Sequence, residues 1–158
     1  MFVKKSAKNQ GFTIIEVLIV LAIAGLIMLI VFLAVPALQR NSRNTQAKNE
    51  AASMLGALNE FMNNNNGKLP AVGVSTTGGT NDASKVFASA KFTNVTALTI
   101  EAQAGTTAPT STTDVLRLGA KCTSATGSTV TPLGAARQVA LLYMIEDSAG
   151  TLVACQES

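Results

Sequence analysis

Residues 4–38 decide the fold of this chain, and they read KKSAKNQGFTIIEVLIVLAIAGLIMLIVFLAVPAL. Three lysines precede Gly11, and the 22 residues from Val17 to Leu38 carry no formal charge. At about 1.5 Å per residue this run makes roughly 33 Å of helix, enough to cross a hydrocarbon core about 30 Å thick. A secretory signal is ordinarily cut after its apolar region. Here the plausible small-residue site, Gly11, comes before it, so cleavage would remove the lysines and keep the helix.

This arrangement resembles the class III leader of type IV pilins and pseudopilins. The resemblance rests on Gly11-Phe12-Thr13-Ile14-Ile15-Glu16, on Val17-Leu18-Ile19-Val20 and on Gly25. It is close over residues 1–60 and extends to the rest only in general layout. It implies that a membrane prepilin peptidase cuts between Gly11 and Phe12 and methylates the new amine of Phe12. It also implies that the mature chain polymerises into a filament.

The net charge of the chain comes from its leader. The sequence has 12 basic and 9 acidic residues. Removal of Lys4, Lys5 and Lys8 leaves nine of each sign, so net charge gives no support to nucleic-acid binding. The three lysines predict that this end stays in the cytoplasm, by the positive-inside rule.

Two cysteines, Cys122 and Cys155, lie in the part of the chain predicted to be exported. In an oxidising compartment such a pair favours one disulfide. Free or metal-binding cysteines are the alternative, but the sequence has no CxxC motif and no histidine.

Residues 12–64 predict one long helix that changes character after residue 43. Its first half is apolar on every face. Its second half carries an apolar stripe at spacings of three and four, which predicts packing against a sheet. The stripe consists of Ala47, Ala51, Met54, Leu55, Leu58, Phe61 and Met62, and Lys48, Asn49, Glu50, Asn59 and Glu60 lie off it. Residues 63–67, NNNNG, predict the end of the helix.

The remainder predicts a small head. Residues 71–114 indicate mostly loop, with a short helix and a strand around Phe87, Phe92, Val95, Leu98 and Ile100. Residues 115–118, 138–146 and 151–155 predict strands, with a turn at 147–150. We therefore expect an α+β fold of the type IV pilin kind, a long helix packed on an antiparallel sheet of three or four strands.

Four parts follow from these patterns: a leader, residues 1–11; a transmembrane or filament-core helix, residues 12–38; an amphipathic half-helix, residues 39–66; and a globular head with a disulfide, residues 67–158.

Glu16 is the residue on which the functional interpretation turns. A charged group in a membrane helix costs on the order of 3 kcal/mol and calls for a partner. The next basic side chain along the helix is Arg40, about six turns away. The resemblance implies a partner from another chain, the amine of Phe12 on an incoming subunit, which would set the register of assembly. The alternative is that Glu16 lies near the cytoplasmic interface and reaches water.

Gly11, Gly25 and Pro36 have both functional and plain interpretations. Gly11 either fits a peptidase pocket that rejects side chains or is a spacer before the helix. Pro36 lacks an N–H and crowds the preceding turn, and Gly25 weakens the helix by about 1 kcal/mol relative to alanine. The two bracket a segment that either bends and unwinds in a filament or contains a tolerated kink.

The head offers no recognisable catalytic grouping. Histidine is absent, and Asp82, Asp114 and Asp147 are scattered along the sequence. We expect no enzymatic activity, no cofactor and no metal.

The sequence thus predicts a structural subunit of a type IV pilus that serves adhesion, twitching motility or DNA uptake. A pseudopilin of a type II secretion system or a minor pilin is the nearest alternative. A membrane-anchored binding domain that never polymerises comes next, and an anchored enzyme last.

The implied partners are copies of the same chain, a prepilin peptidase, and an inner-membrane assembly platform with a cytoplasmic ATPase. Surface or DNA ligands are further candidates. The expected location is a single-pass membrane protein with a cytoplasmic N-terminus before assembly, and an extracellular filament on the cell surface afterwards.

Overall fold

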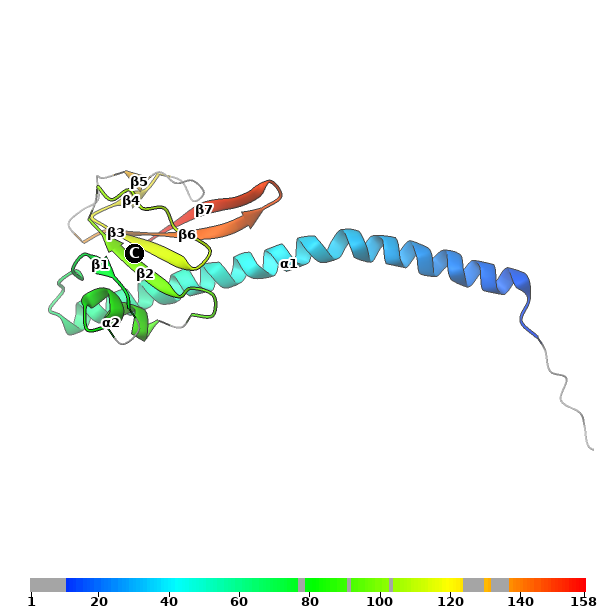
Figure 1. The fold of residues 1–158 in the computed structure, drawn as a ribbon, viewed down its shortest axis with the longest axis horizontal. Coiled ribbons are helices and arrows are strands. Elements are labelled where there is room, and N and C mark those ends of the chain that lie inside the picture. The colour runs from blue at the N-terminus through cyan, green and yellow to red at the C-terminus, as the bar shows by residue number, and fades with distance from the viewer. Residues whose placement is uncertain (1–10, 77–78, 91, 103, 124–129, 132–136) are drawn as a thin grey trace, which may run out of the picture. The chain divides into compact units, whose positions relative to one another are not determined.

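The structure, a computed structural model, describes residues 11–76, 79–90, 92–102, 104–123, 130–131 and 137–158. Contacts along the chain divide it into two compact units, Met1–Gln39 and Arg40–Ser158. The longest element, helix α1 (Ile14–Asn64), contributes to both units (Figure 1). The predicted long helix over residues 12–64 is therefore confirmed to within two residues.

In the first unit, α1 exposes its apolar side chains. Its most apolar stretch has a mean hydropathy of 3.3 and no buried residue. The exposed fraction of its large apolar side chains runs from 40% at Val35 to 82% at Ile14. By length and composition, this is a helix able to span a membrane.

The end of α1 follows from two residues with left-handed backbone. Asn66 has a φ of 55° and Gly67 a φ of 75°. The Gly67 N–H donates to the carbonyl of Met62 at 2.7 Å, which closes the last turn. Asparagine and glycine tolerate this backbone conformation best, so the predicted stop is confirmed.

The second unit contains a mixed five-stranded sheet. The strand order is β1-β2-β3-β6-β7, with bounds β1 (Gly73–Val74), β2 (Ala97–Glu101), β3 (Thr113–Leu118), β6 (Val139–Asp147) and β7 (Gly150–Glu157). A separate two-stranded ladder joins β4 (Lys121–Cys122) to β5 (Val130–Thr131). The α+β fold, a long helix on a small sheet, is confirmed.

The expectation of a purely antiparallel sheet was wrong for one pair of strands. β2 and β3 run parallel, whereas the other three neighbouring pairs of this sheet are antiparallel. Residues 104–112 lead back to the start of β2, where the N–H groups of Thr96 and Ala97 both donate to the carbonyl of Thr112. This long return connection replaces the tight hairpin that an antiparallel pair would need.

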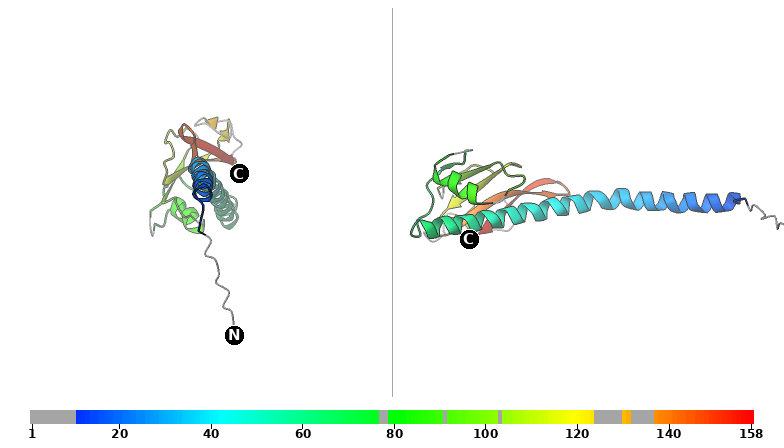
Figure 2. Two further views of the ribbon diagram at one scale, coloured as in Figure 1. Left: turned by 90° about the vertical axis from the view of Figure 1, so that its right-hand side faces the viewer. Right: turned by 90° about the horizontal axis from the view of Figure 1, so that it is seen from below.

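The core lies between the sheet and two helices. Residues of α1 from Arg40 onward pack along one face of the sheet, together with α2 (Asp82–Ser89), as Figures 1 and 2 show. The fully buried side chains of this cluster include Met54, Leu58, Val86, Leu98, Ile100, Leu116 and Leu141. The predicted apolar stripe of the helix and the predicted short helix and strand near residues 87–100 are confirmed.

The opposite face of the sheet carries a smaller cluster of Val115, Ala120, Ala140, Leu142 and Cys155. Cys155 on β7 is joined to Cys122 on β4, with a Cα–Cα distance of 5.8 Å, which fits the predicted disulfide. The hairpin of β6 and β7 pairs residue for residue up to Asp147 and Gly150, as the predicted turn requires.

Candidate functional site

The start of α1 is built as a capping box. Thr13 precedes the first helical residue, Ile14, and Glu16 stands three positions after Thr13. A carboxylate oxygen of Glu16 accepts from the N–H of Thr13 at 2.8 Å and from its hydroxyl at 2.7 Å. The N–H of Glu16 in turn lies 3.4 Å from the Thr13 hydroxyl oxygen. Reciprocal bonds of this kind satisfy N–H groups that have no partner inside the helix.

Glu16 therefore has partners within its own chain, which the sequence-based argument did not include. The capping box holds the carboxylate at the helix N-terminus, where the helix dipole favours negative charge. Thr13 supplies hydrogen bonds but no positive charge. The cap thus orients the carboxylate and leaves its charge available to a cation.

Gly11 and Phe12 lie directly before this cap, and both are exposed. Among the described residues, no atom beyond the adjoining ones lies within 4 Å of where a Cβ at Gly11 would stand. The glycine is therefore not required by packing in this chain. Cleavage after Gly11 would place the new amine on Phe12, four residues from Glu16 at the same helix end.

Gly25 and Pro36 both lie inside α1, which is helical without a break from Ile14 to Asn64. Among the described residues, and apart from its chain neighbours and the backbone of the helix itself, no atom lies within 4 Å of where a Cβ at Gly25 would stand. Any bending or unwinding between these two residues stays a prediction.

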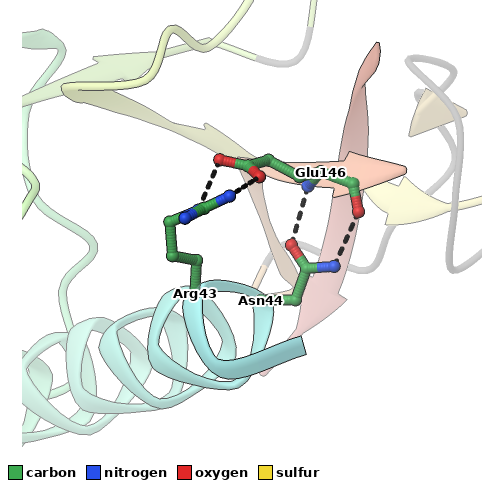
Figure 3. Close-up of polar contacts among 3 residues, drawn as sticks. All are labelled: Arg43, Asn44 and Glu146. Atoms are coloured by element: carbon green, nitrogen blue, oxygen red, sulfur yellow. Dashed lines mark hydrogen bonds and ion pairs between the residues drawn. The ribbon is translucent and has the colours of Figure 1, made fainter. Parts of the chain in front are cut away.

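In the second unit, α1 is attached to β6 through the backbone of Glu146. The side-chain amide of Asn44 donates to the Glu146 carbonyl at 2.7 Å, and its oxygen accepts from the Glu146 N–H at 2.7 Å (Figure 3). The pairing of β6 with β3 ends at Leu142. The carboxamide thus occupies the place of a missing strand beside β6.

Arg43 reinforces this attachment. Its guanidinium binds the Glu146 carboxylate with two hydrogen bonds, from Nε at 2.8 Å and from a terminal nitrogen at 2.6 Å (Figure 3). The hydrogen bonds lower the pKa of the Glu146 carboxyl and raise that of Arg43. Both side chains remain substantially exposed, so water screens the pair.

Two further acidic residues lie where the sequence did not predict them. Glu50, placed off the apolar stripe, is only 6% exposed, and Asp114 is 3% exposed. Glu50 is buried because one of its carboxylate oxygens accepts from the backbone N–H groups of Thr93 and Asn94 and from the side chain of Gln46. Burial, with Glu50 nearby, raises the pKa of Asp114 to about 7.

The sequence contained signals for some of these residues. Thr13-x-x-Glu16 directly before an apolar run is the capping-box pattern and could have been found. Asp114 precedes a predicted strand, but its approach to Glu50 depends on the parallel pairing of β2 and β3. No local pattern indicates that pairing.

The comparisons with known proteins concern the first unit. Residues 6–32 match the family model described as the prokaryotic N-terminal methylation motif. Comparison with curated proteins and with solved structures gives no match. The matched residues span the predicted cleavage site, the capping box and most of the apolar run, up to residue 32. Such a leader implies processing by a prepilin peptidase and assembly at a membrane. The chain therefore carries, at its N-terminus, the class III prepilin leader found in type IV pilins.

Proposed function

We propose that the mature chain is a structural subunit of a type IV pilus filament. In this proposal a prepilin peptidase cuts between Gly11 and Phe12 and methylates the amine of Phe12. The subunit resides in the membrane as a single-pass protein before assembly and then polymerises through α1. The filament serves adhesion, motility or DNA uptake, and the chain itself is not an enzyme.

The observation that carries this proposal is the unpartnered apolar surface of α1 directly after the leader. In the first unit, the large apolar side chains of α1 are 40–82% exposed. Membrane lipid covers such an apolar surface before assembly, and the helices of other copies would cover it in a filament core. Extraction from the bilayer requires work, which we assign to an assembly platform with a cytoplasmic ATPase.

The capped carboxylate of Glu16 favours an ordered polymer rather than a disordered cluster of helices. The charge of Glu16 would pair with the amine of Phe12 on an incoming subunit. In low dielectric such a pair is strongly attractive, and a mispaired charge is costly. Subunits would therefore add in one axial register.

Three alternatives share the same leader and helix. A pseudopilin of a type II secretion system and a minor pilin also assemble through such a helix. A membrane-anchored binding domain would use α1 only as an anchor, and it would need no carboxylate at Glu16.

The decisive experiment combines electron microscopy with mass spectrometry of the N-terminus. Material sheared from cells should contain filaments of a chain that begins at methylated Phe12. A full-length chain that retains residues 1–11 while working normally would contradict the proposal, and so would recovery solely from detergent-extracted membranes.

The processing step has its own test in Gly11→Leu, because a pocket for glycine excludes the larger side chain. This variant should insert into the membrane and keep its leader. A shortened G11L chain with Phe12 at its end would contradict the role of Gly11.

A further inference from the structure

A cavity of about 330 Å³ lies inside the second unit, where the sheet opens between β3 and β6 and faces α1. The β3–β6 pairing ends at Val115 and Leu142, and Thr110 bonds to the backbone of Thr113 beside the start of β3. The cavity is lined by residues from α1, from β6 and from the loops before β2 and β3. It is therefore a product of the fold of the head and independent of the membrane-spanning part of α1.

Asp114 lies in this cavity without a hydrogen-bond partner among the described residues. Asp114 is 3% exposed, and its carboxyl group has no hydrogen bond or ion pair with the described part of the chain. Alternate residues of a strand share a face, and Leu116, two positions on, packs in the cluster against α1. Asp114 therefore faces α1, as its electrostatic interactions with Glu50 and Tyr143 also indicate.

Glu50 and Tyr143 add acceptors to the same cavity. One carboxylate oxygen of Glu50 holds the loop at Thr93 and Asn94, and the other has no hydrogen bond from the described residues. The cation at the rim, Arg43, is engaged by Glu146 (Figure 3). Two buried carboxylates thus face one space, and no basic side chain of the described residues neutralises them.

The rest of the lining is suited to a short hydrocarbon chain. Ala47, Val95, Met144 and Ile145 provide apolar wall, and the hydroxyl-bearing residues 110–112 stand beside it. An ammonium group has three N–H donors and no acceptor, so it matches Asp114, the unused oxygen of Glu50 and the phenolic oxygen of Tyr143. A divalent metal fits less well, because the described residues contain no cluster of three or more metal-ligating side chains.

We propose that this cavity binds a primary ammonium group on an aliphatic chain, with Asp114 and Glu50 holding the charge. The ligand is either a free alkylamine or a lysine side chain of a second copy of this protein. Both sources present the same group, so the recognition chemistry is shared.

The test titrates n-butylamine into the full-length chain in a non-ionic detergent by isothermal calorimetry at pH 8. Butylamine should bind, and 1-butanol, which has the same length but no charge, should bind at least tenfold more weakly. Equal binding of amine and alcohol would overturn the proposal. Binding of Ca²⁺ without binding of butylamine would overturn it as well.

Asp114→Asn should weaken butylamine binding at least tenfold, and the exposed Asp147→Asn serves as the matched control. Glu50→Gln provides a second variant should D114N fail to fold, with circular dichroism as the check.

The wild type offers a third measurement, because Asp114 must lose its proton to pair with an ammonium. Affinity should therefore be higher at pH 8 than at pH 5.5, with Glu50, Tyr143, Arg43 and Glu146 as the other titratable or charged groups around the cavity. Equal affinity at both pH values, or D114N binding within twofold of wild type, would contradict the proposal.

The two sources of the amine are separated by zero-length carboxyl–amine crosslinking of the protein in its native membranes. A link from Asp114 or Glu50 to a lysine of another copy would identify that lysine as the ligand. Butylamine binding without such a link would identify a free amine.

Discussion

The two halves of α1 differ in whether their apolar side chains are exposed or buried. Before residue 40 its large apolar side chains are exposed, and its only acidic group is part of the N-terminal cap. After residue 40 its apolar side chains form a stripe that the sheet and α2 cover, and buried polar groups find partners in the head. The first half depends on surroundings that this chain does not supply, whereas the second half is completed within its own unit. Substitutions in the first half should therefore affect assembly, and those in the second half should affect folding.

The largest effect that distinguishes the halves is expected at Glu16. Glu16→Gln keeps an oxygen for the Thr13 cap but removes the charge, whereas Glu16→Ala removes both. Loss of a buried ion pair worth about 3 kcal/mol would lower subunit association about a hundredfold. Both variants should reach the membrane in normal amounts and yield few filaments by electron microscopy.

Glu60→Ala, on an exposed part of the second half, is the control and should assemble as the wild type does. If E16Q formed abundant filaments while E16A did not, the cap and not the charge would be what assembly requires.

A matched pair of leucines sharpens the comparison further. Leu58 is fully buried, whereas Leu38 in the same helix is 71% exposed. Leu58→Ala should lower the free energy of unfolding of the head by about 2–5 kcal/mol, because it leaves a cavity in a packed core. Leu38→Ala should leave that free energy unchanged.

Tyr143 gives the readout for this pair. It is the sole tyrosine of a chain without tryptophan, and it lies in the core of the head. Its fluorescence during chemical denaturation therefore reports the head alone. An equal loss of stability in both leucine variants would show that the two halves are not energetically separate.

The next effect concerns Asp114 and depends on pH. Its pKa is about 7 in the folded chain against an ordinary 3.8, so the folded state binds more protons than the unfolded state between these values. The contribution of Asp114 to stability therefore falls as pH rises from about 4 to about 7, by at most about 4 kcal/mol. Asp114→Asn removes this slope, so the variant should gain stability relative to wild type across that window.

Denaturation curves at several pH values would measure the difference, with the exposed Asp147→Asn as control. Parallel stability curves for D114N and wild type would contradict the buried position of Asp114.

The smallest effect is expected where α1 meets β6. Asn44→Ala removes two hydrogen bonds and should cost about 1–3 kcal/mol in the free energy of unfolding. Arg43→Ala breaks an exposed ion pair next to it and should cost less than N44A. Tyr143 fluorescence again gives the measurement, and a larger loss in R43A than in N44A would reverse the assigned importance of the two contacts.

The sequence predicts local features of this fold well. The apolar run, the stripe at spacings of three and four, the asparagine–glycine stop and the β6–β7 hairpin all arise from neighbours in the chain. The capping box of Thr13 and Glu16 belongs to the same class of local features.

Features that depend on distant contacts could not be predicted in this way. The parallel pairing of β2 and β3 depends on the return of the chain to the start of β2, where Thr96 and Ala97 bond to Thr112. The burial of Glu50 depends on backbone N–H groups more than forty positions away, at Thr93 and Asn94. The cavity that contains Asp114 depends on both. Helical periodicity places Glu50 off the apolar stripe, because it measures apolar content and not the availability of hydrogen-bond partners.

The carboxamide of Asn44 has a consequence for crowded surroundings. An unpaired strand edge can recruit an extended segment from another protein and so start β-sheet aggregation. Beyond Leu142, β6 would offer such an edge, but one side chain from the helix already takes both of its hydrogen-bonding positions at Glu146. Copies of the chain at high density can thereby keep their sheets apart.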